Sequence, residues 1–190
     1  NADSFDNTVI SGHTALAAIP ATTDELLISD AGTIKRIDAQ FFQNTPAFFA
    51  YLSGDQNISN NTATKASFDT EDFDTDSMYD ASTNYRFTPT VAGKYFVYAC
   101  LTISASAYVA YATQLNIRKN GADYIVDRAS TANDALLELT MHGSGVIDFN
   151  GSSDYVEVFG LSERHSGSAQ QKFVAANRRS HFGAFKIIGA

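Results

Sequence analysis

The stretch GKYFVYACLTI, residues 93–103, decides the fold class of this 190-residue chain. It begins at a glycine shortly after Pro89 and carries three aromatic side chains within four positions. Aromatic and β-branched side chains favour the pleated, half-buried surface of a strand. The stretch therefore predicts a long and largely buried β-strand.

Shorter apolar runs on both sides of this stretch alternate with turn-forming residues, at the spacing typical of a β-sandwich. Lys119–Ala122 predicts a tight Asn-Gly turn between two strands, and Gly143–Gly145 predicts an interruption that ends one strand before the next begins. No sustained 3.6-residue apolar stripe indicates a helix. We predict an all-β sandwich with strands at 47–52, 85–88, 94–103, 113–118, 123–126, 137–142, 146–149, 155–159 and 180–188.

Residues 1–45 differ in composition from the rest of the chain, because they include few aromatic residues and several short apolar runs. The run Leu26–Ile37 predicts a small hairpin around the turn Asp30–Gly32. An isolated hairpin is marginal in water, so this segment needs partners to be stable. We predict an N-terminal β-rich stem over residues 1–45 and a head over residues 46–190.

Composition excludes several classes of protein. The formal net charge of −8 argues against binding of nucleic acid or docking on an anionic membrane, and no stretch has the apolar length needed for membrane insertion. The single cysteine, Cys100, excludes an intrachain disulfide framework and is expected to be a small buried hydrophobe. The 14 Phe and 9 Tyr exceed what one sandwich core needs, which favours an additional buried surface.

No catalytic constellation can be assembled from the sequence, so we expect a protein that is not an enzyme. The run His142–Gly145 departs from the spacing of a nucleophile elbow. The histidines His13, His142, His165 and His181 are far apart and form no zinc-binding pair.

An acidic stretch over residues 69–76 has two interpretations. Clustered carboxylates on a loop are the ligands that calcium prefers, and Asp72, Asp74 and Asp76 are the candidates. The spacing departs from that of an EF-hand, and the neighbouring phenylalanines indicate that part of the stretch is a strand. The other interpretation is a solvated acidic face without a cofactor.

Several motifs follow one another along the chain. The first is an apolar strand at Pro46–Ala50, and the next is a Tyr-Asp pair followed by a Phe-Thr-Pro strand end and a Gly-x-Tyr strand. A hairpin ending in Asn-Gly, an Asp-x-Val-x-Val strand and a final Ser-x-Phe-x-Gly-Phe pattern follow, with Ala184 in place of the last glycine. These later motifs lie at 78–80, 85–98, 115–121, 154–158 and 180–185. In this order they resemble the C1q-like domain.

The resemblance implies an antiparallel jelly roll of the C1q and tumour necrosis factor type, assembled as a homotrimer. Some heads of this family bind calcium near the trimer apex. Residues 16–37 resemble, more loosely, a connecting segment of tailed-bacteriophage structural proteins. The collagen stalk of complement relatives, with glycine at every third position, is absent. The resemblance therefore favours a virion fibre or tip protein, located on the particle surface and joined to other virion proteins through the stem.

Host attachment is the function expected of such a protein, with a host-surface glycan or protein as ligand. Tyr108, Tyr111 and Tyr124 are candidates for stacking on sugar rings, or else pack in the core or along the trimer axis. The polar run Arg164–Lys172, including His165, has the character of a ligand-contact loop or of a solvated connector. Two alternatives remain open: a purely structural virion component, such as a head fibre or decoration protein, and a secreted bacterial C1q-like adhesin.

Overall fold

The computed structural model describes residues 20–21, 23–39, 46–107, 110–131, 136–164 and 167–187. The chain divides into two compact units, residues 1–44 and 45–190, and each is described by itself. Within the described residues the secondary structure is β apart from the short 3₁₀ turn η2 (Ala176–Arg178) and a 3₁₀ residue at Ala39. None of the described segments forms a helix long and apolar enough to cross a membrane.

The described part of the N-terminal unit is a hairpin, which confirms the prediction for this run. Its strands are β1 (Glu25–Asp30) and β2 (Thr33–Asp38), paired antiparallel with Asp30 opposite Thr33. Ala31 and Gly32 occupy the two-residue turn with φ of 49° and 85°. Positive φ at both positions defines the turn type whose twist matches that of paired strands.

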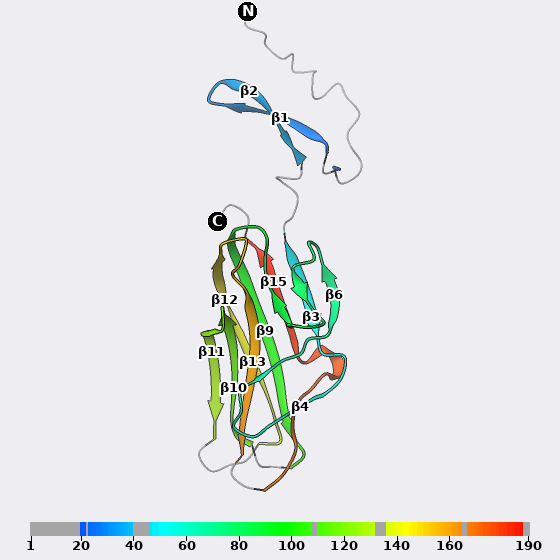
Figure 1. Cartoon of the computed structure of the whole chain (residues 1–190), viewed down its shortest axis with the longest axis vertical. Coiled ribbons are helices and arrows are strands. Elements are labelled where there is room, and N and C mark those ends of the chain that lie inside the picture. The colour runs from blue at the N-terminus through cyan, green and yellow to red at the C-terminus, as the bar shows by residue number, and fades with distance from the viewer. Residues whose placement is uncertain are drawn as a thin grey trace, which may run out of the picture. The chain divides into compact units, whose positions relative to one another are not determined.

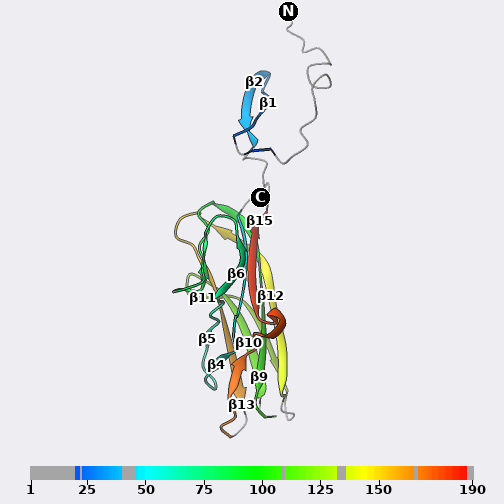
Figure 2. The same ribbon diagram turned by 90° about the vertical axis from the view of Figure 1, so that its right-hand side faces the viewer.

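The head consists of two antiparallel sheets packed face to face, as Figure 1 shows and as the rotated view of Figure 2 also displays. The seven-stranded sheet has the order β4 (Gln56–Ile58), β14 (Gln171–Phe173), β9 (Gly93–Ala105), β15 (His181–Lys186), β3 (Ala47–Tyr51) and β6 (Thr70–Asp74), with β12 (Glu138–Phe149) on the other edge of β9. The six-stranded sheet has the order β11 (Ala122–Ser130), β10 (Ala110–Lys119), β13 (Val156–Arg164), β8 (Arg86–Phe87) and β7 (Tyr79–Asp80), with β5 (Thr64–Lys65) paired to β13.

The core lies between the two sheets and is rich in aromatic rings. Alternate residues of β9, from Tyr95 to Ile103, are fully or almost fully buried there. The Phe48 ring stacks on Tyr79 and Phe87 at 4.7 and 4.6 Å between ring centroids, and meets Phe182 edge-on at 4.9 Å. Such pairs add about 0.5–1.5 kcal/mol each beyond the area they bury.

The predicted break at Gly143–Gly145 is wrong, because β12 continues through it without interruption. Its glycines are required by close packing rather than by a turn. A Cβ at Gly143 would lie 2.8 Å from Cδ2 of Leu115, and a Cβ at Gly145 would lie 2.8 Å from Cδ1 of Ile125. The missing side chains let β12 approach the opposite sheet and close that edge of the sandwich.

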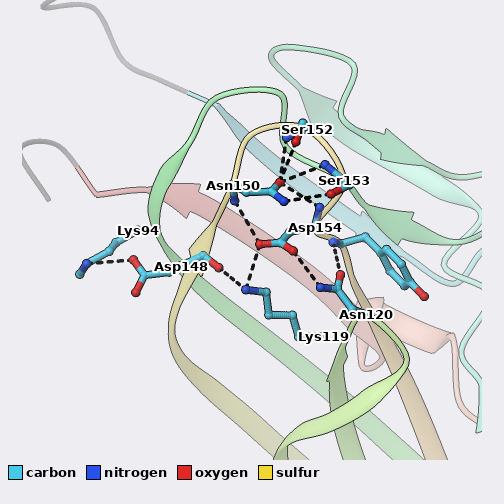
Figure 3. A network of polar contacts seen from close by, with 9 residues as sticks. Lys94, Lys119, Asn120, Asp148, Asn150, Ser152, Ser153 and Asp154 are labelled. Carbon is cyan, nitrogen blue, oxygen red and sulfur yellow. Dashed lines mark hydrogen bonds and ion pairs between the residues drawn. The ribbon is translucent and has the colours of Figure 1, made fainter.

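A polar network pins the turns at the end of the head where β3 begins (Figure 3). The Asn150 side-chain oxygen accepts the backbone N–H groups of Ser152, Ser153 and Asp154 at 2.9–3.1 Å. The Asp154 carboxylate in turn accepts from the Asn120 side chain at 2.8 Å, in the turn between β10 and β11. Asn120 and Gly121 have φ of 52° and 82°, which confirms the predicted Asn-Gly turn.

Candidate functional site

The end of the head opposite the start of β3, here called the distal end, brings together the connections predicted to carry the ligand site. The pairing of β9 with β12, β14 and β15 places Gly93 near the start of β3 and Ala105 at the far end. The β9–β10, β11–β12 and β13–β14 connections therefore share the distal end, which lies at the bottom of Figure 1.

Hydrogen bonds tie the two predicted ligand loops to each other. The Ser106 backbone N–H donates to the Gln170 carbonyl at 2.9 Å, and the Gln170 N–H donates to Oγ of Ser106 at 3.1 Å. The run after β9 and the run before β14 are therefore neighbours. Tyr108 and His165 lie outside the described residues.

Tyr111 is half-buried on β10 at the distal end, where its side chain joins a short chain of polar contacts. Its hydroxyl donates to Oε2 of Glu163 at 2.7 Å, and the other oxygen of that carboxylate pairs with the Arg128 guanidinium at 3.0 Å. The hydrogen bond to the Glu163 carboxylate raises the pKa of the Tyr111 hydroxyl. The tyrosine is thereby held in one orientation at the rim of the distal end.

Arg164 anchors the β13–β14 connection rather than extending freely from it. Its backbone N–H donates to Oδ1 of Asn60 at 2.9 Å, and its guanidinium donates to the Ala169 carbonyl at 2.8 Å. The connection is shorter than the predicted run Arg164–Lys172, because β13 extends to Arg164 and β14 begins at Gln171.

Lys172 lies on a strand, β14, where the sequence predicted the end of a loop. Its ammonium pairs with Oδ2 of Asp55 at 2.6 Å, and this hydrogen bond is the main cause that lowers the pKa of Asp55. Tyr124 lies on β11 beside the Asn120–Gly121 turn, at the end opposite Tyr111. The structure therefore brings Tyr111 and Arg164 to the distal end but not Tyr124.

The three aspartates predicted as calcium ligands do not converge. Asp72 forms a two-point ion pair with the Arg178 guanidinium, with both distances 2.9 Å. Asp74 caps a backbone turn instead, accepting the N–H of Tyr79 at 2.7 Å and that of Asp76 at 3.3 Å. Across the part of the chain that the structure describes, no three His, Cys, Asp or Glu side chains form a group that could hold a metal ion. The carboxylates of Asp72 and Asp74 are therefore engaged separately, one by a guanidinium and the other by a backbone turn.

The outer side of the seven-stranded sheet carries an unusual surface that no motif of the sequence located. Residues of β9 that alternate with the core positions point there, as do those of β3, β6 and β15 paired to them. We call this surface the aromatic face, and its members are Phe49, Tyr51, Phe73, Phe96, Tyr98, His181 and Phe185. Phe73 and Phe185 are 48% and 44% exposed.

The rings of the aromatic face form a nearly continuous layer. Phe96 lies 5.5 Å from Phe185 and 6.1 Å from Tyr98, while His181 lies 6.3 Å from Tyr98 and 5.3 Å from Phe49, all measured between ring centroids. Exposed apolar patches of this kind on a soluble domain mark interaction surfaces. A sequence signal was present: Tyr95, Phe96 and Tyr98 put aromatic side chains on both faces of one strand, whereas a solvated sheet would alternate with polar residues.

Gly183 gives Tyr98 its place on the aromatic face. A Cβ at position 183 would lie 2.4 Å from the Tyr98 hydroxyl oxygen and 2.5 Å from Cζ. The tyrosine ring therefore covers the glycine backbone, and its burial raises the pKa of the hydroxyl.

At one side of the aromatic face, the Arg178 guanidinium lies 4.5 Å from the centroid of the Tyr51 ring. Cation and ring attract each other in this geometry, which fixes that side of the face.

Cys100, also on β9, is a buried thiol as expected. It is 4% exposed, and its sulfur lies 3.2 Å from the Arg179 carbonyl oxygen. Burial raises the pKa of the thiol, which opposes formation of the reactive thiolate.

Comparison with known proteins tests the fold. No protein-family model matches the chain, and no curated protein matches it. Among solved structures, murine APRIL at pH 5.0 aligns over 75% of this chain and 98% of its own, with 12% identity and a TM-score of 0.55. The head is a jelly roll of the C1q and tumour necrosis factor type.

Two further solved structures overlap the same region with lower scores. The globular domain of a zebrafish complement 1qA protein covers 76% of this chain and 98% of its own, at 15% identity and a TM-score of 0.49. The Eiger TNF of S. frugiperda covers 76% and 92%, at 12% identity and a TM-score of 0.48. At these identities the likeness concerns the fold alone.

Proposed function

We propose that the chain is a homotrimeric attachment protein on the surface of a bacteriophage particle, and that its head binds a glycan on the host cell. The observation that carries this proposal is the arrangement of the head. Its chain enters at one end, the predicted ligand loops gather at the other, and one long side carries the aromatic face.

The aromatic face supports the homotrimer. A monomer would leave seven aromatic side chains on one side, some of them nearly half exposed. Association would remove their apolar area from water, and each Å² of apolar area buried contributes about 25 cal/mol of free energy. Closed symmetric assembly is the common way for one chain to bury such a surface against its own copies. In the jelly roll this face belongs to one sheet, so three heads would meet along their length and leave the distal ends free.

The distal end supports binding through hydrogen bonds and ring stacking. Tyr111 is held by Glu163, and Arg164 and Asn60 fix the neighbouring connection, so the rim is ordered before a ligand arrives. With a net charge of −8, the chain has little means of attracting an anionic polymer through long-range charge. A neutral or zwitterionic sugar suits this surface, because a tyrosine has an apolar ring and a polar hydroxyl group, and this combination favours a hydrated interface.

The N-terminal unit supports placement on a virion. Its hairpin exposes apolar side chains, and the loose resemblance of residues 16–37 to phage connecting segments gives the class of neighbour. In this proposal the stem joins the head to other virion proteins.

A paired substitution tests the ligand site. The double variant Tyr108→Ala/Tyr111→Ala should lose binding to host cells while keeping the wild-type sedimentation coefficient. Tyr124→Ala is the matched control, because it removes a more exposed tyrosine, 55% exposed, at the opposite end of the same sheet. Wild-type binding by the double variant, or loss of binding by the control alone, would contradict the proposed site.

A purely structural virion role is the second candidate. It is favoured by the engagement of Tyr111 and Arg164 within the chain, which leaves their polar groups already satisfied. Tyr111→Phe separates the two roles, since it keeps the ring and removes only the hydrogen bond to Glu163. A structural role predicts a lower melting temperature with no cell binding to lose, whereas attachment through ring stacking predicts retained binding.

A further inference from the structure

The hairpin of the N-terminal unit carries apolar side chains that its own fold does not cover. Leu26, Leu27, Ile28 and Ile34 are 47%, 65%, 37% and 54% exposed. The two strands are only six residues each, and a two-stranded hairpin of this size is marginal in water by itself. A hairpin of this composition gains stability when another surface packs on it.

The strand register separates these side chains into two faces. Residues directly opposite in an antiparallel pair share a face, so Leu26 and Ile37 lie together, with Ile28 two positions further along. These three form a compact apolar cluster at the open end of the hairpin. Leu27 and Ile34 lie on the opposite face, diagonal to each other and opposite Arg36 and Ser29.

Four charges of the hairpin pair within it. Arg36 pairs with Glu25 at 2.9 Å on the face that carries Leu27, and Lys35 pairs with Asp30 near the turn on the face that carries Leu26. A partner therefore need not supply opposite charge. It need only offer an apolar surface of similar size, which a second copy of the same cluster does.

The covalent link to the head makes copies of this chain the favoured partner. Six residues, 40–45, separate the described hairpin from the head, and six residues span at most about 22 Å. If the head is trimeric, three hairpins are thereby confined near one another at an effective concentration that reaches the millimolar range for short linkers. No soluble partner competes easily at that concentration.

We propose that three copies of the hairpin pack together through Leu26, Ile28 and Ile37, forming an apolar core of a trimeric stem. This inference rests on the proposed homotrimer of the head. The opposite face, with Leu27 and the Arg36–Glu25 pair, points outward. The stem thus begins as a self-associating element before it meets any other virion protein.

Single cysteines report which face turns inward. In the full chain with Cys100→Ala as background, Ile28→Cys should form a covalent dimer on mild oxidation, because two of three thiols meet inside the stem. Ser29→Cys is the matched control on the opposite face, one residue away. We expect at least about tenfold more dimer from Ile28→Cys than from Ser29→Cys. Equal yields, or more dimer from Ser29→Cys, would overturn the proposal.

Trypsin gives a second measurement without new cysteines, since Lys35 and Arg36 are cleavage sites within β2. Packed hairpins should be cut at least about tenfold more slowly in the wild-type protein than in Leu26→Asn/Ile28→Asn, because cleavage requires local opening. Sedimentation of each sample distinguishes the two proposals. A monomer would refute the homotrimer of the head, whereas a trimer whose hairpin is cut equally fast in both proteins would refute only the packed stem.

Discussion

The two outer faces of the head differ in what covers their large side chains. On the seven-stranded sheet, the aromatic face holds rings against rings, with Arg178 at its side. On the six-stranded sheet, cations of the same chain cover two of the rings, whereas Tyr124 is 55% exposed. The Arg118 guanidinium lies 4.0 Å from the centroid of Phe159, and the Arg86 guanidinium lies 4.5 Å from that of Tyr155.

The ion pairs of the six-stranded sheet complete this cover. Arg118 also pairs with Asp123 at 2.6 Å, and Lys65 pairs with the buried carboxylate of Glu157. On the six-stranded sheet, cations that shield rings and charges that are paired favour contact with water. On the aromatic face, uncovered rings favour contact with a partner. The difference indicates which side of the sandwich faces its copies and which side faces solvent in the proposed trimer.

The largest expected effect comes from placing a charge on the aromatic face. Phe185→Glu should convert the assembly to monomers of 20.5 kDa, because burial of an unpaired carboxylate at the interface costs about 3–5 kcal/mol. Tyr124→Glu, on the six-stranded sheet and 55% exposed, should leave the trimer intact. Sedimentation equilibrium of both variants measures the difference, and equal behaviour of the two would erase the functional distinction between the faces.

A milder change tests whether the rings of the aromatic face must already be in position before the heads associate. Gly183→Ala places a methyl group where the Tyr98 hydroxyl now lies, so the ring must move outward. We expect weaker trimer association, by about 1–3 kcal/mol as for other overpacked sites. Gly54→Ala is the control, because its Cβ meets nothing within 4 Å. Unchanged association in Gly183→Ala would show that the position of Tyr98 does not contribute to assembly.

Much of the fold could be predicted because local signals and tertiary structure agree. The hairpins at Asp30–Thr33 and Lys119–Ala122 follow from turn residues with positive φ. The long strand β9 follows from its aromatic and β-branched content. The error at β12 arose because Gly143 and Gly145 are spacers for Leu115 and Ile125, and a close approach between distant strands leaves no mark in the local sequence.

The candidate site was harder to predict than the fold. Tyr111 and Arg164 lie at one end of the head, since the jelly-roll order determines which loops share an end. The sequence left two interpretations of the acidic stretch open, because the partners of its carboxylates, Arg178 for Asp72 and the Tyr79 backbone for Asp74, are distant or hidden in the local sequence. The sequence signals the aromatic face through an excess of rings and through the aromatic residues on both faces of β9, but its members come from four strands that are paired by tertiary structure.

The smallest expected effect concerns the solvated face and its response to acid. The hydrogen bond from Arg118 lowers the pKa of Asp123 below its ordinary value of 3.8. A carboxyl group whose pKa is lowered by folding stabilises the folded state at any pH above its pKa in the unfolded chain. This stabilisation is lost as the pH falls through the lower pKa of the same group in the folded protein.

Asp123→Asn should therefore lower the free energy of unfolding at pH 7 by about 0.2–1 kcal/mol, the range for a pair this exposed to water. The difference between wild type and variant should shrink as the pH falls below 3.8, and it should vanish only below the lowered pKa of the folded protein, where the wild-type carboxyl also becomes neutral. Denaturant titrations of both proteins at several pH values measure this, and the double variant Arg118→Met/Asp123→Asn isolates the pair because methionine keeps a flexible apolar chain near Phe159. A difference that persists unchanged at low pH would mean that Asp123 acts through packing rather than charge, and the solvated face would then owe less to its ion pairs than its geometry indicates.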